Sequence, residues 1–248
     1  MALDEVQLAT IRKLDAEARL ARANAEQVEL TLEGERGLVQ NTSKTNKDQA
    51  ESQKAAAEAR TAEIEAQKAE SLFNKEQAKD EYHHVYQFGG KVSETTVNAC
   101  IAKLSEWSRL APECEIEIVF NSGGGSVIDG FALYDFLISL RAAGHLIVTV
   151  ARGMAASMAG ILLQAGDVRV IGSESVLLVH EISFGANGKI GEVEDTVDLA
   201  KILTKRVMNI FVGRTHLTAR QLDTKWKRKD WFMDSSEALK LGFVDEIR

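Results

Sequence analysis

The sequence predicts an α/β domain with a largely parallel sheet, preceded by a helical arm. After residue 80, apolar runs of strand length alternate with helical segments. Before it, the chain is rich in Ala, Glu, Gln, Lys and Arg and has no aromatic residue ahead of Phe73. That composition favours helices but supplies little material for a core. We therefore divide the chain into an arm, residues 1–80, and a domain, residues 81–248.

The arm carries two apolar stripes with alternating spacings of three and four, typical of coiled-coil helices. The first implies a partner helix and consists of Ile11, Leu14, Ala18, Ala21, Ala25, Val28 and Leu32. The second is mostly alanine and contributes less on burial; it consists of Ala55, Ala59, Ala62, Ala66, Ala69 and Phe73. Turn-forming residues at 34–46 predict a linker between two helices. The alternative is an arm that is mostly disordered in isolation, because it is highly charged and poor in aromatics.

The elements expected in the domain follow from its periodicity. The expected strands are 85–88, 116–120, 147–150, 168–171 and 176–180. The expected helices are 95–110, 130–143, 155–165 and 193–211, with a further helix starting near Ser235.

Composition excludes several classes of partner. The net charge is −7 and no basic run occurs, which argues against nucleic acid. No uninterrupted apolar stretch reaches the length of about 18 residues that suits a membrane helix, and the N-terminus lacks the apolar centre of a secretion signal. We expect a cytoplasmic protein without a membrane partner. Cys100 and Cys114 have neither metal-ligand spacing nor a disulfide framework, so we expect two small buried residues in a reducing compartment.

Two glycine-containing segments follow predicted strands. Residues 121–126, Asn-Ser-Gly-Gly-Gly-Ser, lie at a strand-to-helix junction, where backbone amides approach an oxyanion or a phosphate. The alternative is a tight turn for chain reversal. In residues 153–160, small residues surround Ser157 and leave room for a substrate carbonyl, while the amide of Met158 in the first helical turn is free to face an oxyanion. The alternative is a serine that only packs.

A histidine and an aspartate complete a candidate catalytic set. His180 ends a predicted strand, which would hold its side chain in place. A neutral imidazole at this position can take a proton from a serine and later return it to the leaving amine. A carboxylate must then orient the imidazole, and Asp230 precedes a predicted helix start. Rival carboxylates are Asp195 and Asp198, and His216 is the rival base. Each of these residues also has a purely structural interpretation, and covalent serine catalysis needs no metal or organic cofactor.

Together these segments resemble the ClpP family of serine peptidases. Residues 121–130 resemble its glycine loop, 153–166 its nucleophile segment, 177–181 its histidine strand and 229–247 its aspartate segment and closing element. The resemblance covers residues 82–248. It implies a crotonase/ClpP-like fold with repeated β-β-α units and a Ser157, His180 and Asp230 triad. It further implies oxyanion amides at Gly125 and Met158, with Gly124 supporting the loop, and a homo-oligomer of stacked rings joined through residues 182–211.

Two departures from the family pattern bear on function. Gly123 stands where the family carries proline, which should loosen the loop. The long arm replaces a short axial loop that cooperates with an unfoldase. The leading hypothesis is therefore an endopeptidase of the kind tailed bacteriophages use for head maturation, cleaving scaffold or capsid protein within a procapsid. Alternatives are a cytoplasmic degradation peptidase gated by an AAA+ unfoldase and a structural assembly protein with a vestigial site.

Overall fold

The computed structural model describes residues 5–35 and 42–248. The chain divides into two compact units, Met1–Tyr82 and His83–Arg248. In the described residues, no helix combines the length and apolar character needed to cross a bilayer.

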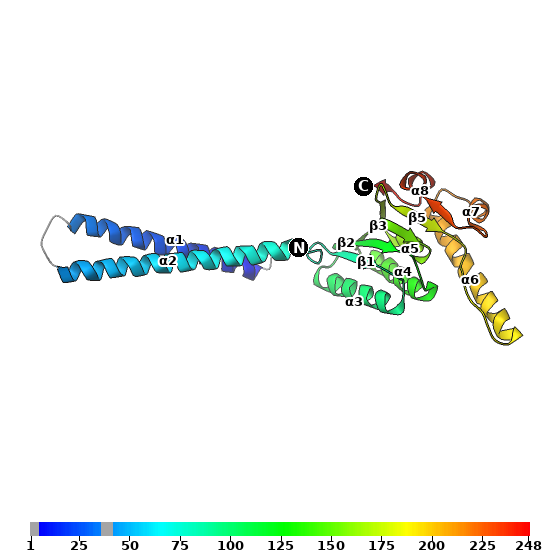
Figure 1. The fold of residues 1–248 in the computed structure, drawn as a ribbon, viewed down its shortest axis with the longest axis horizontal. Coiled ribbons are helices and arrows are strands. Elements are labelled where there is room, and N and C mark those ends of the chain that lie inside the picture. The colour runs from blue at the N-terminus through cyan, green and yellow to red at the C-terminus, as the bar shows by residue number, and fades with distance from the viewer. Residues whose placement is uncertain (1–4, 36–41) are drawn as a thin grey trace. The chain divides into compact units, whose positions relative to one another are not determined.

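The first unit is a helical hairpin. Helices α1 (Glu5–Glu35) and α2 (Thr42–Gln77) pack side by side (Figure 1). The described side chains of both apolar stripes are buried or half-buried, with Ala18 and Ala59 the most enclosed, so α2 is the partner helix of the first stripe. Arg22 of α1 forms an ion pair with Glu63 of α2. The predicted linker was too long: residues 34–35 and 42–46 are helical, and its remainder, 36–41, lies outside the described residues.

The second unit is a sheet in the order β1-β2-β3-β4-β7, with β5 paired to β3 and β6 paired to β5. Every pairing is parallel except β5 with β6. The strands are β1 (Val85–Gly89), β2 (Glu115–Ser122), β3 (Leu146–Ala156), β4 (Val168–Ile171), β5 (Val176–Val179), β6 (Trp231–Met233) and β7 (Glu246–Ile247). The α/β class with a largely parallel sheet is therefore confirmed.

The helices of the second unit match the expected ones except at their ends. They are α3 (Glu94–Leu110), α4 (Val127–Ala142), α5 (Met158–Leu162) with a 3₁₀ turn η1 (Leu163–Ala165), α6 (Ile190–Arg214), α7 (Ala219–Trp226) and α8 (Ser235–Leu241). The helix expected from residue 155 starts three residues late, because the main chain of 154–156 still belongs to β3 and pairs with β5. Helix α7 and strands β6 and β7 were not predicted.

The core lies between the sheet and its helices (Figure 1). On β2, Ile116, Ile118 and Phe120 alternate toward this core, as the two-residue period of a strand requires. They meet Leu104 of α3 and Leu133 of α4 in one continuous cluster. A smaller cluster covers the opposite face and consists of Val119, Val148, Val150 and Val170. This core fixes β2, β3 and β5, whose C-terminal ends carry the candidate site residues.

A histidine pair lies at the edge of this core. The His84 ring is 5.5 Å from the Trp107 ring centroid, and within the described residues its buried Nε2 has no hydrogen-bond partner. His145 is also buried: its Nε2 lies 2.8 Å from the Ser108 hydroxyl, and its Nδ1 contacts the half-buried Cys114. Cys100 is fully buried. Burial lowers the pKa of His84, and the neighbouring His145 and His83 lower it further, against a hydrogen bond to the Glu115 backbone that raises it.

The protein should therefore lose stability in mild acid. Because the folded-state pKa of His84 lies below its ordinary value of 6.5, the unfolded chain takes up the proton first. The stability contributed by neutral His84 is complete above about pH 6.5 and is lost as pH falls through the folded-state pKa. Thermal unfolding between pH 7 and pH 5 measures the loss. His84→Phe should reduce this pH dependence strongly, whereas His83→Phe should reduce it much less, because exposed His83 is the smallest contributor to the lowered pKa of His84. Equal slopes for all three proteins would contradict the prediction.

Candidate active site

Ser157 lies at a sharp turn between β3 and α5. Its backbone has φ 54° and ψ −121°, a strained conformation for a residue other than glycine. The turn is held from both sides, since the Ser157 amide donates to the Leu178 carbonyl of β5 at 2.9 Å and the Ser157 carbonyl accepts from Ile161 in α5. Such a strand-to-helix turn presents a serine hydroxyl at the surface of a parallel sheet.

Small residues allow this close packing, as the sequence predicted. A side chain at Gly160 would approach the Ala155 carbonyl and Leu177 to 3.3 and 3.2 Å. At Gly130 of α4, an added Cβ would come within 2.3 Å of the Met158 side chain, so glycine there provides the room in which Met158 is buried.

The glycine loop lies directly against the serine turn. A Cβ on Gly124 would lie 2.7 Å from the Ser157 Cβ and 3.0 Å from the Met158 amide nitrogen. The loop is fixed by Val92, whose amide donates to Gly124 and whose carbonyl accepts from Ser126, both at 2.9 Å. Gly125 has φ +153°, and a Cβ there would fall 2.1 Å from the Val92 carbonyl. Two close approaches therefore require glycine at 124 and 125. Gly123 has open space around it.

Ser157 and His180 line the same pocket. Gly125, Glu181 and Ser183 also line it. Its apolar lining is formed by Val127, Met158, Ile161, Val179, Ile182, Val207 and Phe211. His180 directly follows β5, and its Nδ1 donates to the main-chain carbonyl of Glu181. Because a carbonyl only accepts, the proton resides on Nδ1 and Nε2 is left as the basic nitrogen.

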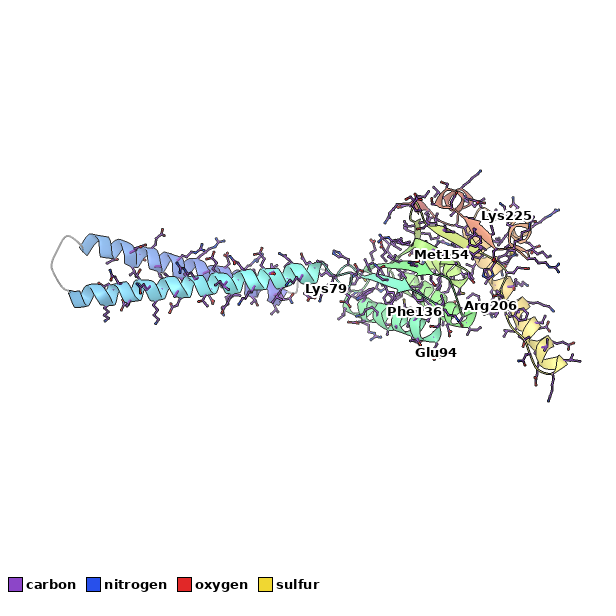
Figure 2. All side chains as sticks on the ribbon, in the orientation of Figure 1. Lys79, Glu94, Phe136, Met154, Arg206 and Lys225 are labelled. Atoms are coloured by element: carbon purple, nitrogen blue, oxygen red, sulfur yellow. The ribbon has the colours of Figure 1, made fainter. Side chains whose placement is uncertain are left out.

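Asp230 directly precedes β6, and His180 directly follows β5. The antiparallel pairing of β5 with β6 ends at Val179 and Trp231. His180 and Asp230 are the next residues beyond this end of the two strands. Asp230 is exposed, and among the described contacts it makes no hydrogen bond to His180. Lys225 of α7, labelled in Figure 2, lies 4.8 Å above the Trp231 ring and packs α7 against β6.

The rival residues are not brought to this pocket. Asp195 and Asp198 are exposed on α6, where Asp198 pairs with Lys201 at 2.8 Å. His216 donates to the Lys240 carbonyl and packs against Gly242. In the described part of the chain, no group of three or more His, Cys, Asp or Glu residues is arranged to hold a metal ion.

One residue of the pocket escaped sequence reasoning. Glu181 accepts a hydrogen bond from the Arg228 amide at 2.7 Å through its Oε2. An acidic residue directly after a strand-end histidine was the available signal, but its partner lies 47 positions away in the chain.

A serine on a strained strand-to-helix turn, with a histidine in the same pocket of a parallel α/β sheet, defines a serine hydrolase class of site. Comparison with known proteins identifies the family. The Clp protease family model matches residues 67–248. The "ATP-dependent Clp protease proteolytic subunit 2" of Tropheryma whipplei is 33% identical over 162 residues, covering 64% of this chain and 88% of the relative. A proteolytic subunit of Deinococcus radiodurans is 32% identical (64% and 77% covered), and one of Leifsonia xyli is 34% identical (64% and 80%).

The chain therefore belongs to the Clp protease family and is a serine-type peptidase, a hydrolase. The matched range begins inside α2, so residues 1–66 lie outside it.

Proposed function

We propose that the protein is a serine endopeptidase that cleaves polypeptides with Ser157 as nucleophile, His180 as general base and Asp230 as the carboxylate that orients His180. The observation that carries the proposal is that Ser157 and His180 line one pocket, with Nε2 of His180 left as its basic nitrogen. The apolar lining beside the hydroxyl suits a substrate side chain.

The reaction follows from these positions. His180 Nε2 takes the Ser157 proton as Oγ attacks the peptide carbonyl carbon, and the amides of Gly125 and Met158 stabilise the resulting oxyanion, with Gly124 keeping the loop against them. The carbon–nitrogen bond then breaks, and His180 returns its proton to the leaving amine. Water, deprotonated by the same imidazole, hydrolyses the acyl ester and regenerates Ser157.

Covalent labelling tests this assignment. A fluorophosphonate reacts with an activated serine oxygen, so intact-mass measurement of the wild-type protein should show a single adduct that peptide mapping assigns to Ser157. Ser157→Ala should show none. An unlabelled wild-type protein would favour a vestigial site in a structural assembly protein.

We also propose that the protein assembles into a homo-oligomer. Large apolar side chains are exposed on and before α6, namely Phe184, Ile190, Leu199 and Ile202, with Ile190 81% exposed. A monomer leaves them in water, whereas ring-forming contacts through residues 182–211 would bury them. Native mass spectrometry tests assembly and self-processing of the arm together; a monomer at all concentrations would overturn it.

We propose that residues 1–80 form a separate arm. We also propose that the biological role is that of a phage-type protease, which matures scaffold or capsid protein in the cytoplasm or within a procapsid. The helical hairpin of α1 and α2 supports this role, since it resembles a delivery segment. The second candidate, degradation with an AAA+ unfoldase, is favoured by the names of the relatives, which are ATP-dependent proteolytic subunits. Cleavage of a co-expressed cognate scaffold supports the first role. Binding of the arm to a ring ATPase, with ATP-stimulated degradation, supports the second.

A further inference from the structure

Glu181 contacts His180 and the segment that leads to Asp230 through different atoms. Its main-chain carbonyl accepts from Nδ1 of His180. Its side-chain Oε2 accepts from the Arg228 amide at 2.7 Å, two residues before Asp230. Glu181 also lines the pocket of Ser157. A single residue therefore connects the histidine to the segment that carries the aspartate.

This connection lies just beyond the point where β5 and β6 stop pairing in the sheet. The β5–β6 pairing ends at Val179 and Trp231. Arg228 has φ 55°, a backbone conformation that costs energy outside glycine and needs an external contact to persist. The bond from Glu181 supplies that contact, so Asp230 is held between the strand pair on one side and the Glu181 carboxylate on the other.

In the proposed triad, the Asp230 carboxylate accepts the N–H that the Glu181 carbonyl accepts in this structure. In this structure the carbonyl takes it and Asp230 is exposed. For Asp230 to take over, its segment has to stay within reach of the imidazole while it rearranges. A charged acceptor makes a stronger hydrogen bond than a neutral one, so a carboxylate is suited to keep hold of the Arg228 amide during that change.

We propose that Glu181 is a positioning residue for the triad: its carboxylate tethers the segment 228–230 beside His180 and so delivers Asp230 to Nδ1. This inference rests on the proposed function and adds to it a residue that does not touch the reacting atoms.

The test compares Glu181→Ala, which removes the acceptor, with Glu181→Gln, whose side-chain carbonyl still accepts from Arg228. Glu174→Ala, an exposed acid in the turn before β5, is the matched control. For hydrolysis of a fluorogenic peptide by the full chain, Glu181→Ala should lower kcat on the order of 10- to 100-fold with little change in KM, because the catalytic groups are misplaced while the pocket remains. Glu181→Gln should recover most of the loss.

A double-mutant cycle separates positioning from a general structural effect. In an Asp230→Asn background, Glu181→Ala should cost little more, since the residue it positions is already disabled. Full additivity, or equal losses in the Gln and Ala variants, would overturn the proposal. If the proposed function is wrong, Ser157→Ala retains hydrolysis. If Ser157→Ala is inactive but Glu181→Ala keeps the wild-type kcat, only the positioning role of Glu181 is overturned.

Discussion

Ser157→Ala is expected to lower kcat for peptide hydrolysis by at least about 10⁴-fold, with KM almost unchanged. The substitution removes the atom that would form the acyl ester in the proposed mechanism but leaves the rest of the pocket lining intact. Among the described residues, the Ser157 hydroxyl makes no hydrogen bond that the fold would lose. Alanine adopts φ 54° no less readily than serine, so the turn should persist. The measurement is initial rate against concentration for a fluorogenic peptide.

Ser183→Ala is the control for this experiment, because Ser183 lines the same pocket and is exposed. It should keep kcat close to the wild-type value. A Ser157→Ala protein that retains a tenth of the wild-type rate, or a Ser183→Ala protein that loses as much as Ser157→Ala, would remove Ser157 from the role of nucleophile. Thermal unfolding of both variants should match that of the wild type.

The sequence predicted the parts of the site that depend on local pattern. The strands before Ser157 and His180 have the apolar runs of buried parallel strands, and the small residues around Ser157 match the space found at Gly160 and Gly130. The position of Ser157 on a strained turn was not predicted: residues 155–156 read as helix, and their pairing with β5, together with that of Ala155 with β2, extends the strand.

The position of Asp230 depends on contacts between segments that lie far apart in the sequence. Strand β6 has three residues and follows a charged segment, so its pattern is too short to show a strand or its register. The pairing of Val179 with Trp231, which brings His180 and Asp230 to the same end of the strand pair, comes from tertiary packing. The Glu181 contact and the buried Arg169 were missed for the same reason, since charged residues in a strand pattern read as solvent-facing.

Arg169 holds the C-terminal part of the domain together, and its removal should cause the largest loss of stability. The residue is 6% exposed on β4, and it donates to both carboxylate oxygens of Asp245, at 2.9 and 2.5 Å. Its remaining NH1 donates to Gln164 and to the carbonyls of Arg214 and Gly242 at 2.7–2.9 Å. Burial alone would raise the pKa of Asp245, but the bonds from Arg169 outweigh it and lower that pKa.

Arg169→Ala should therefore reduce the free energy of unfolding by about 3 kcal/mol, chiefly the cost of leaving Gln164 and two carbonyls without their donor. Asp245 loses its partner as well, but its side chain is 40% exposed and can be solvated. Urea titration followed by tryptophan fluorescence measures it as a lower midpoint with a similar slope. Arg152→Ala, at an exposed position of β3, is the matched control and should stay within about 0.5 kcal/mol of the wild type. Arg169→Lys should be intermediate, because an ammonium keeps the charge but not the fork-shaped donor set.

Because the network ties β4 to the chain that follows β6 and Asp230, a destabilised Arg169→Ala protein should also lose activity at temperatures where Ser183→Ala remains active. An Arg169→Ala midpoint equal to that of Arg152→Ala would show that the network contributes no net stability, as happens when the desolvation of a buried ion pair cancels its attraction.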